Sequence, residues 1–269
     1  MKGFILSLRS EYYKSRKTGG FWSPIILPII LCALIGYNFY VEAARWKEMP
    51  SMLLWMRFSG IILGIMGTLL LPILIVFISY SINSVEHKAD TWKSIFSLPI
   101  PKASIYLAKI VYAILLILLC LLLFCIFTIG LGNLMSHFKP ELRFTDYSFS
   151  SYLISVYFKL FLSSMGILSI QFLLSLLFRD FLKPMGIGFA ATITGVIAVT
   201  QQWSWNYLFP YSHPLLAMQS LAGPHKPNIL GIMILPEVQI FTREVWVSLI
   251  IAAVVFTAGF VIVQKRSVK

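Results

Sequence analysis

Residues 58–104, FSGIILGIMGTLLLPILIVFISYSINSVEHKADTWKSIFSLPIPKAS, place a long apolar run directly before a charged break. Residues 58–85 contain no Asp, Glu, Lys or Arg. A helix of about 20 such residues crosses the hydrocarbon core of a bilayer. The break that follows carries lysines, acids and a histidine, and it ends on Pro99 and Pro101. This stretch therefore predicts a membrane-spanning helix whose chain then returns to water.

The composition of the whole chain supports a lipid environment. Of its 269 residues, 58% are hydrophobic and 12% are charged, and the mean hydropathy is +0.84. A soluble domain carries about 25% charged residues, so this chain could not cover a water-facing surface. The net charge is +12, and most of the Lys and Arg residues that produce it stand at the ends of apolar runs. We therefore interpret the basic residues as topology signals and lipid contacts, and expect no nucleic-acid partner.

Six charge-poor runs predict an all-α integral membrane protein with a single transmembrane domain over residues 1–269. The fifth run is short and rich in glycine, so its limits are the least defined. The expected spans are residues 21–41, 56–82, 105–130, 152–178, 184–202 and 245–264.

The distribution of Lys and Arg orients these spans. With both termini inside, 14 of the 22 basic residues fall in inside segments and 8 in outside segments. Positive residues concentrate on the cytoplasmic side. We therefore expect both termini of this multi-pass membrane protein on the cytoplasmic side.

The pattern of the charged break predicts a short amphipathic helix over about residues 84–98. Asn83 is a typical N-cap, and Glu86 stands three residues later, as a capping box requires. An apolar stripe recurs at helical spacing, at Val85, Ala89, Trp92 and Phe96. Such a helix either lies on the lipid headgroups or docks a cytoplasmic partner.

Two further segments lie outside the spans. Residues 2–17 combine apolar positions on one helical face with basic residues elsewhere, which predicts an interfacial helix before the first span. Residues 201–244 form a long, aromatic and proline-rich outer segment. This segment is either a re-entrant or interfacial piece on the outer face or an ordinary extracellular loop.

A few residues inside the runs invite a structural interpretation. The spacing of Gly60, Gly64 and Gly67 would allow close packing of two helices, within the chain or between two chains. Lys159 and Arg57 are expected to extend to the headgroups at the outer ends of their spans. The three cysteines fall inside apolar runs and are expected to be small packing residues.

Several function classes are disfavoured by the sequence. It contains no G-x-x-x-x-G-K-[ST] motif, so we expect no ATP hydrolysis by this chain. The span centres lack Asp, Glu, Lys and Arg, and Gln171 is their most polar residue, which argues against an ion-coupled transporter. The four histidines form no recognisable enzyme motif. We therefore expect no catalytic, cofactor-binding or metal-binding residues.

Three stretches resemble the ABC-2 type family of ABC transporter permeases, especially the permeases of lantibiotic and bacitracin self-protection exporters. The first is LRSEYYKSRKTGGFW at residues 8–22, with a Glu-x-x-Lys element at Glu11 and Lys14, followed by LPII at 27–30. The second is VEHKADTWKSIFSLPIPKASIYLAK at 85–109, and the third is YLFPYSHPLLAM at 207–218. The chain lacks the large extracellular domain of longer family members.

The resemblance implies a transmembrane subunit that exports an amphipathic peptide antibiotic or a lipid-like compound. It also implies two permease chains, identical or related, and a separate ABC ATPase that carries the ATP and magnesium. The helix between spans two and three would couple the permease to that ATPase, and an interfacial helix containing Glu11, Lys14 and Arg16 would lie beside it. The alternatives are another cargo (an ion, a polysaccharide or a lipid) or a transporter that works without an ATPase. The coupling residues implied by the resemblance are Glu86, His87, Lys88, Asp90, Trp92, Lys93 and Phe96.

Overall fold

The computed structural model describes residues 2–89, 99–219 and 237–265, and within these ranges the chain is helical and contains no strand. Six helices are long and apolar enough to cross a membrane, which confirms the predicted all-α integral membrane fold. The predicted coupling residues Asp90, Trp92, Lys93 and Phe96 lie outside the described residues. The elements are α1 (Lys2–Ser15), α2 (Gly19–Val41), α3 (Ala43–Trp46), α4 (Ser51–Ile65), the π-helix η1 (Met66–Leu70), α5 (Leu71–Ala89), α7 (Lys102–Phe138), η2 (Phe144–Asp146), α8 (Ser150–Leu177), α9 (Leu182–Thr200), η3 (Asn206–Leu208), η4 (Pro210–Ser212), α10 (His213–Gln219) and α11 (Arg243–Lys265).

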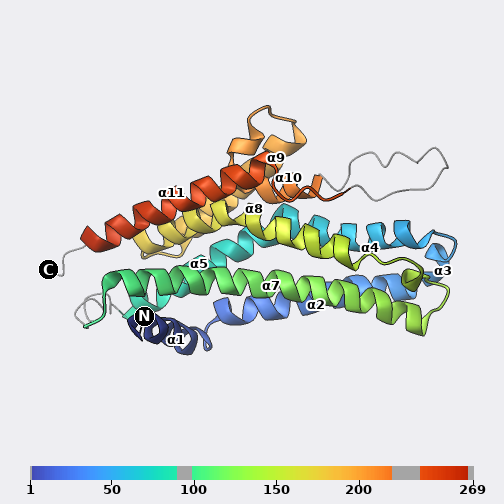
Figure 1. The fold of residues 1–269 in the computed structure, drawn as a ribbon, viewed down its shortest axis with the longest axis horizontal. Coiled ribbons are helices and arrows are strands. Elements are labelled where there is room, and N and C mark those ends of the chain that lie inside the picture. Colours follow the sequence, from blue (N-terminus) through green and yellow to red (C-terminus); the bar gives the residue numbers. More distant parts are fainter. Residues whose placement is uncertain (1, 90–98, 220–236, 266–269) are drawn as a thin grey trace.

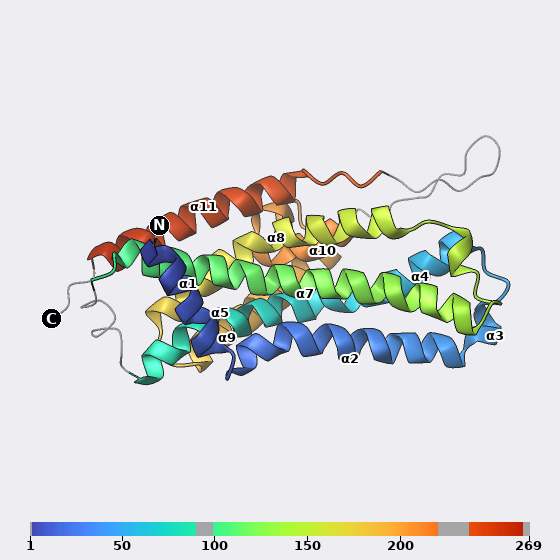
Figure 2. The ribbon, with the colours of Figure 1, turned by 60° about the horizontal axis from the view of Figure 1, so that its bottom comes forward.

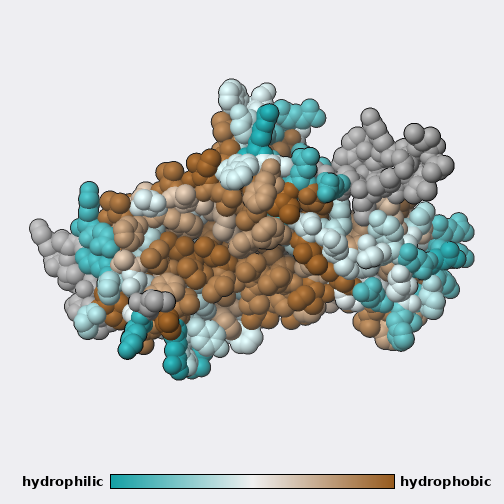
Figure 3. Space-filling model, in the orientation of Figure 1, coloured by the Kyte–Doolittle hydropathy of each residue, from teal (hydrophilic) through white to brown (hydrophobic). Residues whose placement is uncertain are grey.

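The spanning helices run roughly along one long axis, and α1 crosses one end of the bundle (Figures 1 and 2). The end of α5, the start of α7 and the C-terminal end of α11 lie at this same end, which we call the α1 end. The opposite end, where α3 lies, is called the α3 end. An apolar band covers the middle of the molecule between more polar ends (Figure 3), as expected for a chain surrounded by lipid.

The second spanning helix is unusually long and contains a wide turn. It runs from Ser51 to Ala89, and its 39 residues would extend about 58 Å at about 1.5 Å per residue. The wide turn is η1, and Pro72 follows it directly. Proline lacks a backbone N–H, and its ring clashes with the preceding turn of a regular α-helix. The wider π-helical turn directly before Pro72 relieves this clash.

This long helix corrects one sequence prediction. Asn83 does not begin a new helix, because α5 continues without interruption from Leu71 to Ala89. Asn83 is fully buried, and its amide Nδ2 donates to the Ser175 hydroxyl at 2.8 Å rather than to a helix N-terminus. The first part of the proposed 84–98 helix is therefore the last turn of the second span.

A cluster of aromatic side chains closes the α3 end. The Trp55 indole is buried, stacks on Phe149 and donates its Nε1–H to the Phe144 carbonyl at 2.8 Å. Gly132 of α7 lies directly against the indole ring, so any side chain at this position would collide with the ring. This packing fixes the loop 139–149 to the bundle.

The first part of the outer segment folds back against the spanning helices. After α9 ends at Thr200, the Tyr211 backbone returns to pack on Gly195, and the Gln171 side chain donates to the Tyr211 hydroxyl. Met218 of α10 packs against Gly67 in the π-helical turn. Residues 206–219 therefore pack on the bundle, and the apolar stretch 228–235 lies outside the described residues.

Candidate functional site

A buried ionic cluster joins α1, α5 and α7 at the α1 end. At its centre, the Lys109 ammonium lies 2.8 Å from a Glu86 carboxylate oxygen and 2.9 Å from a Glu11 carboxylate oxygen. A third contact, at 3.1 Å, runs to the backbone carbonyl of Ile82. Lys109 and Glu86 are each only 1% exposed. Each of these charges therefore depends on the others for its compensation.

Lys14 completes the cluster from the more open side. Its ammonium lies 3.1 Å from the second Glu11 oxygen and 3.0 Å from the second Glu86 oxygen. Two ammonium groups and two carboxylates thus alternate, and their formal charges cancel. Burial lowers the pKa of Lys14, but the adjacent charges of Glu11 and Glu86 raise it, and the net shift of its pKa is upward.

The three helices supply these groups from suitable positions. Glu11 and Lys14 are three residues apart, so they share one face of α1. Glu86 stands in the last turn of α5, and Lys109 stands two turns into α7, so both approach the same level from opposite chain directions. A hydrogen bond between the Ser15 and Tyr112 hydroxyls adds a second link between α1 and α7.

A second polar set ties the same part of α5 to α8. The Ser175 hydroxyl lies 2.9 Å from the Ser79 carbonyl and accepts the bond from Asn83. The His87 Nε2 lies 3.0 Å from the Ser175 backbone carbonyl. The last turns of α5 are therefore held on one side by charges and on the other by hydroxyl and amide groups.

Comparison with known proteins places this architecture in a family. A family model described as "ABC-2 family transporter protein" matches residues 7–195. The chain belongs to the ABC-2 transporter family. The matched range contains all four residues of the ionic cluster. No curated protein and no solved structure matches the chain.

As a member of the ABC-2 family, this chain is a membrane permease component. Such a chain is the transmembrane subunit and not the ATPase, and it implies an ABC ATPase partner in general. The described residues contain no group of three His, Cys, Asp or Glu side chains arranged to hold a metal.

The structure separates the candidate coupling residues of this ABC-2 permease into distinct environments. Glu86 is buried in the ionic cluster, His87 is partly buried against α8, and Lys88 is exposed. Glu86 therefore serves a contact inside the chain, which corrects its assignment to a partner-facing surface. Arg16 stays exposed, with its guanidinium 5.2 Å from the Tyr13 ring centre.

Sequence reasoning missed Lys109 as a member of this site. Lys109 stood there only as the last residue of the stretch 85–109, because a sequence does not show which charges meet. One signal in the sequence could have indicated the contact. Glu86 stands near the end of span two, and Lys109 stands near the start of span three. Glu86 and Lys109 flank one short connection, so antiparallel neighbours would bring them together.

A second buried ion pair lies between α8 and α11, away from the cluster. The Lys159 ammonium lies 3.3 Å from a Glu244 carboxylate oxygen, and Lys159 is only 1% exposed. The prediction that Lys159 extends to the headgroups is therefore wrong. Arg57 does remain exposed, with its guanidinium 5.6 Å from the Trp46 ring centre.

The three predicted packing glycines also differ from one another. Met218 of the same chain packs directly against Gly67. A side chain added at Gly60 or Gly64 would meet no atom of this chain within 4 Å. Of these three glycines, Gly60 and Gly64 therefore leave a free helix face.

Proposed function

We propose that this chain is the transmembrane permease subunit of an ATP-driven exporter, and that the ionic cluster passes movement from a partner ATPase into the bundle. The observation that carries the proposal is the position of the cluster. It fastens the two helices that flank residues 90–98, namely α5 and α7, to the helix α1 that crosses the end of the bundle. A displacement applied to that connection would reach all three helices together.

Rigidity at this point supports such a role. Buried charges cannot separate without leaving one of them unpaired in a medium of low polarity, and that costs several kcal/mol. The last turns of α5 are also held to α8 through Asn83 and Ser175. A push on α5 would therefore move α1, α7 and α8 rather than bend α5 alone.

The direct contact with the ATPase is proposed for Lys88 and for residues 90–98. Lys88 is exposed at the end of α5, and the family resemblance adds Asp90, Trp92, Lys93 and Phe96. Two large aromatic side chains among charged neighbours suit insertion into a cleft on a partner. In this proposal Glu86 lies behind the contact and transmits its movement.

The proposed cargo is an amphipathic peptide antibiotic or a lipid-like compound, following the resemblance to self-protection exporters. Large exposed apolar side chains on α2, including Trp22 and Ile30, show a bundle that meets hydrocarbon over much of its surface. A membrane-soluble cargo could reach such a bundle from the bilayer. Ions, polysaccharides or other lipids remain the alternative cargoes, and transport without an ATPase is the remaining alternative.

The proposed assembly pairs two permease chains with two ATPase chains in a bacterial cytoplasmic membrane. The open face at Gly60 and Gly64 supports a close helix contact with a second permease. The positive-inside count supports a cytoplasmic position for the α1 end and for both termini. This orientation brings residues 90–98 to the side on which ATP is available.

The test is to reconstitute the chain with its ATPase in vesicles and measure ATP hydrolysis and cargo export together. We expect the Trp92→Ala/Phe96→Ala variant to insert normally but to lose most ATP-dependent export. Lys2→Ala, a change of an exposed residue at the same end, serves as the control. Normal assembly and export by the double variant would refute the coupling assignment.

A further inference from the structure

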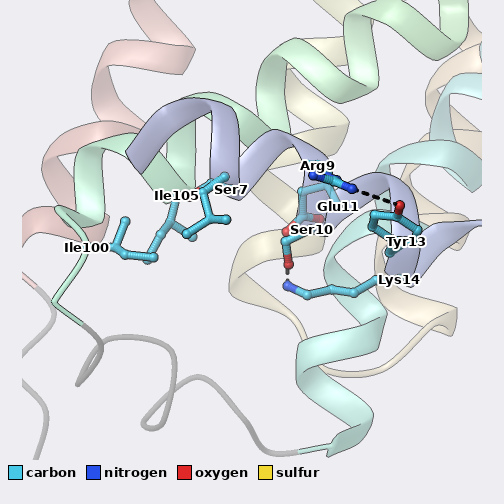
Figure 4. Close-up of a pocket in the computed structure, with 9 residues that line it drawn as sticks. Ser7, Arg9, Ser10, Glu11, Tyr13, Lys14, Ile100 and Ile105 are labelled. Atoms are coloured by element: carbon cyan, nitrogen blue, oxygen red, sulfur yellow. Dashed lines mark hydrogen bonds and ion pairs between the residues drawn. The ribbon is translucent and has the colours of Figure 1, made fainter. Parts of the chain in front are cut away.

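A groove runs beside α1 on the outside of the ionic cluster (Figure 4). It has a volume of about 560 Å³ and lies between α1 and the start of α7. Arg9, Ser10 and Lys14 contribute polar groups to its wall, while Leu6 and Ile100 contribute apolar surface. The groove therefore combines hydrogen-bond donors with an apolar lining.

Two cationic side chains, Arg9 and Lys14, and one carboxylate, Glu11, line this groove. The Glu11 carboxylate in its wall is already held by Lys14 and Lys109. Lys14 uses two contacts, to Glu11 and Glu86, of the three that an ammonium group can donate. The exposed guanidinium of Arg9 lies 5.5 Å from the Tyr13 ring centre and donates a long hydrogen bond, at 3.4 Å, to the Tyr13 hydroxyl. Within the part of the chain that the structure describes, the groove thus offers donors to an anion.

The exposed side of α1 has the composition of a membrane interface. Ile5 is 62% exposed and Leu6 is 59% exposed, and both tyrosines of the helix are also exposed. The basic residues Arg9, Arg16 and Lys17 stand among them. Aliphatic, tyrosine and cationic side chains occur together where a helix lies at the level of lipid headgroups.

The start of α2 also indicates a position at the level of the lipid headgroups. The Trp22 side chain is 50% exposed, and its indole Nε1 donates to the Arg16 carbonyl at 3.1 Å. A tryptophan with an exposed ring and a satisfied N–H is typical of the boundary between hydrocarbon and headgroups. The groove therefore opens at headgroup level.

We propose that this groove binds the phosphate headgroup of an anionic phospholipid. Arg9 and Lys14 donate to the phosphate oxygens, and an acyl chain continues along Leu6 toward the apolar band. Because Lys14 also contacts Glu11 and Glu86, the bound lipid shares a group with the ionic cluster. The anionic lipid of the inner leaflet thus becomes part of the structure that holds α1 against α5.

The test measures lipid binding by the purified chain in detergent, without any ATPase. Native mass spectrometry is used to titrate dioctanoyl phosphatidylglycerol, dioctanoyl phosphatidylcholine and inorganic phosphate. The variants are Arg9→Gln, Arg9→Lys and the control Arg45→Gln. Arg45 is also exposed and also lies over an aromatic ring, but it pairs with Glu42 in the α3 region.

The wild type should bind phosphatidylglycerol at least fivefold more tightly than phosphatidylcholine. Arg9→Gln should weaken phosphatidylglycerol binding about fivefold, which corresponds to about 1 kcal/mol for one basic residue near an anionic surface. Arg9→Lys should retain most of the affinity, and Arg45→Gln should retain all of it. Because no ATPase is present, this result is independent of the proposed transport function.

Three outcomes would overturn the lipid site. Equal binding of the two lipids would remove the headgroup preference, and an unchanged preference in Arg9→Gln would place the lipid elsewhere. Inorganic phosphate binding as tightly as phosphatidylglycerol would assign the groove to a free anion.

Discussion

Lys109→Met tests the ionic cluster most directly, because it removes the central cation and keeps a side chain of similar length. The variant loses the contacts at 2.8 Å to Glu86, at 2.9 Å to Glu11 and at 3.1 Å to the Ile82 carbonyl. Two buried carboxylates then share Lys14 alone. Breaking a buried ion pair by removing one partner costs about 3–5 kcal/mol, and we expect a loss of free energy of unfolding in this range.

A second change should recover part of that loss. The double variant Lys109→Met/Glu86→Leu removes one charge of each sign and leaves the Glu11–Lys14 pair at 3.1 Å. Replacing a buried ion pair by apolar side chains is often close to neutral. We therefore expect the double variant to lose at least about 2 kcal/mol less than the two single variants together.

The assay is unfolding in mixed detergent and SDS micelles, followed by far-ultraviolet circular dichroism. Lys183→Met is the control, because its ion pair with Asp180 is exposed and should contribute less than about 1 kcal/mol. The reasoning fails if Lys109→Met costs less than about 1 kcal/mol, or if the two single losses simply add. The same variants should lower export per ATP hydrolysed once the ATPase is present.

Three further predictions concern other parts of the bundle. Gly132→Ala should cost about 1–3 kcal/mol in the same unfolding assay, because its methyl group meets an indole ring, whereas Gly130→Ala in the same helix meets no atom within 4 Å and should gain up to about 1 kcal/mol. Lys159→Met should cost about 3–5 kcal/mol, because it strands a largely buried carboxylate, while Lys183→Met stays near zero; equal losses would contradict this. Burial lowers the pKa of His213 from 6.5 to about 4, so its contribution to stability is complete above about pH 6.5 and is lost as the pH falls toward 4. Wild type should therefore lose up to about 3 kcal/mol more than His213→Gln over that interval, and parallel pH curves would refute this.

Hydropathy was enough to predict the spanning helices, because an apolar run of sufficient length has few other stable environments. The boundary at Asn83 was wrong for a physical reason. The stripe through Val85 and Ala89 has the same helical period whether a new helix starts or the preceding span continues. Asn83 can cap a helix or pair with a neighbouring helix, and only the position of Ser175 decides between them.

The site was harder to predict than the fold. Glu11, Lys14 and Glu86 could be selected from local patterns and from the family resemblance, but their common partner could not. Lys109 stands 98 residues from Glu11 in the sequence, and the contact exists because α1 folds back across the end of α7. Lys159 shows the same limit, since its extension to the headgroups was a reasonable expectation until Glu244 was found beside it.

The form of the cluster bears on how a moving permease could keep charges buried. Each ammonium group contacts both carboxylates, and each carboxylate contacts both ammonium groups. If α5 moved relative to α1, Glu86 could exchange one contact while Lys109 kept Glu11, so no charge would become isolated. A single ion pair at this place would have to break completely for the same displacement. Four alternating charges therefore combine a high cost of separation with a tolerance for small shifts, and a connection that transmits force between helices requires both properties.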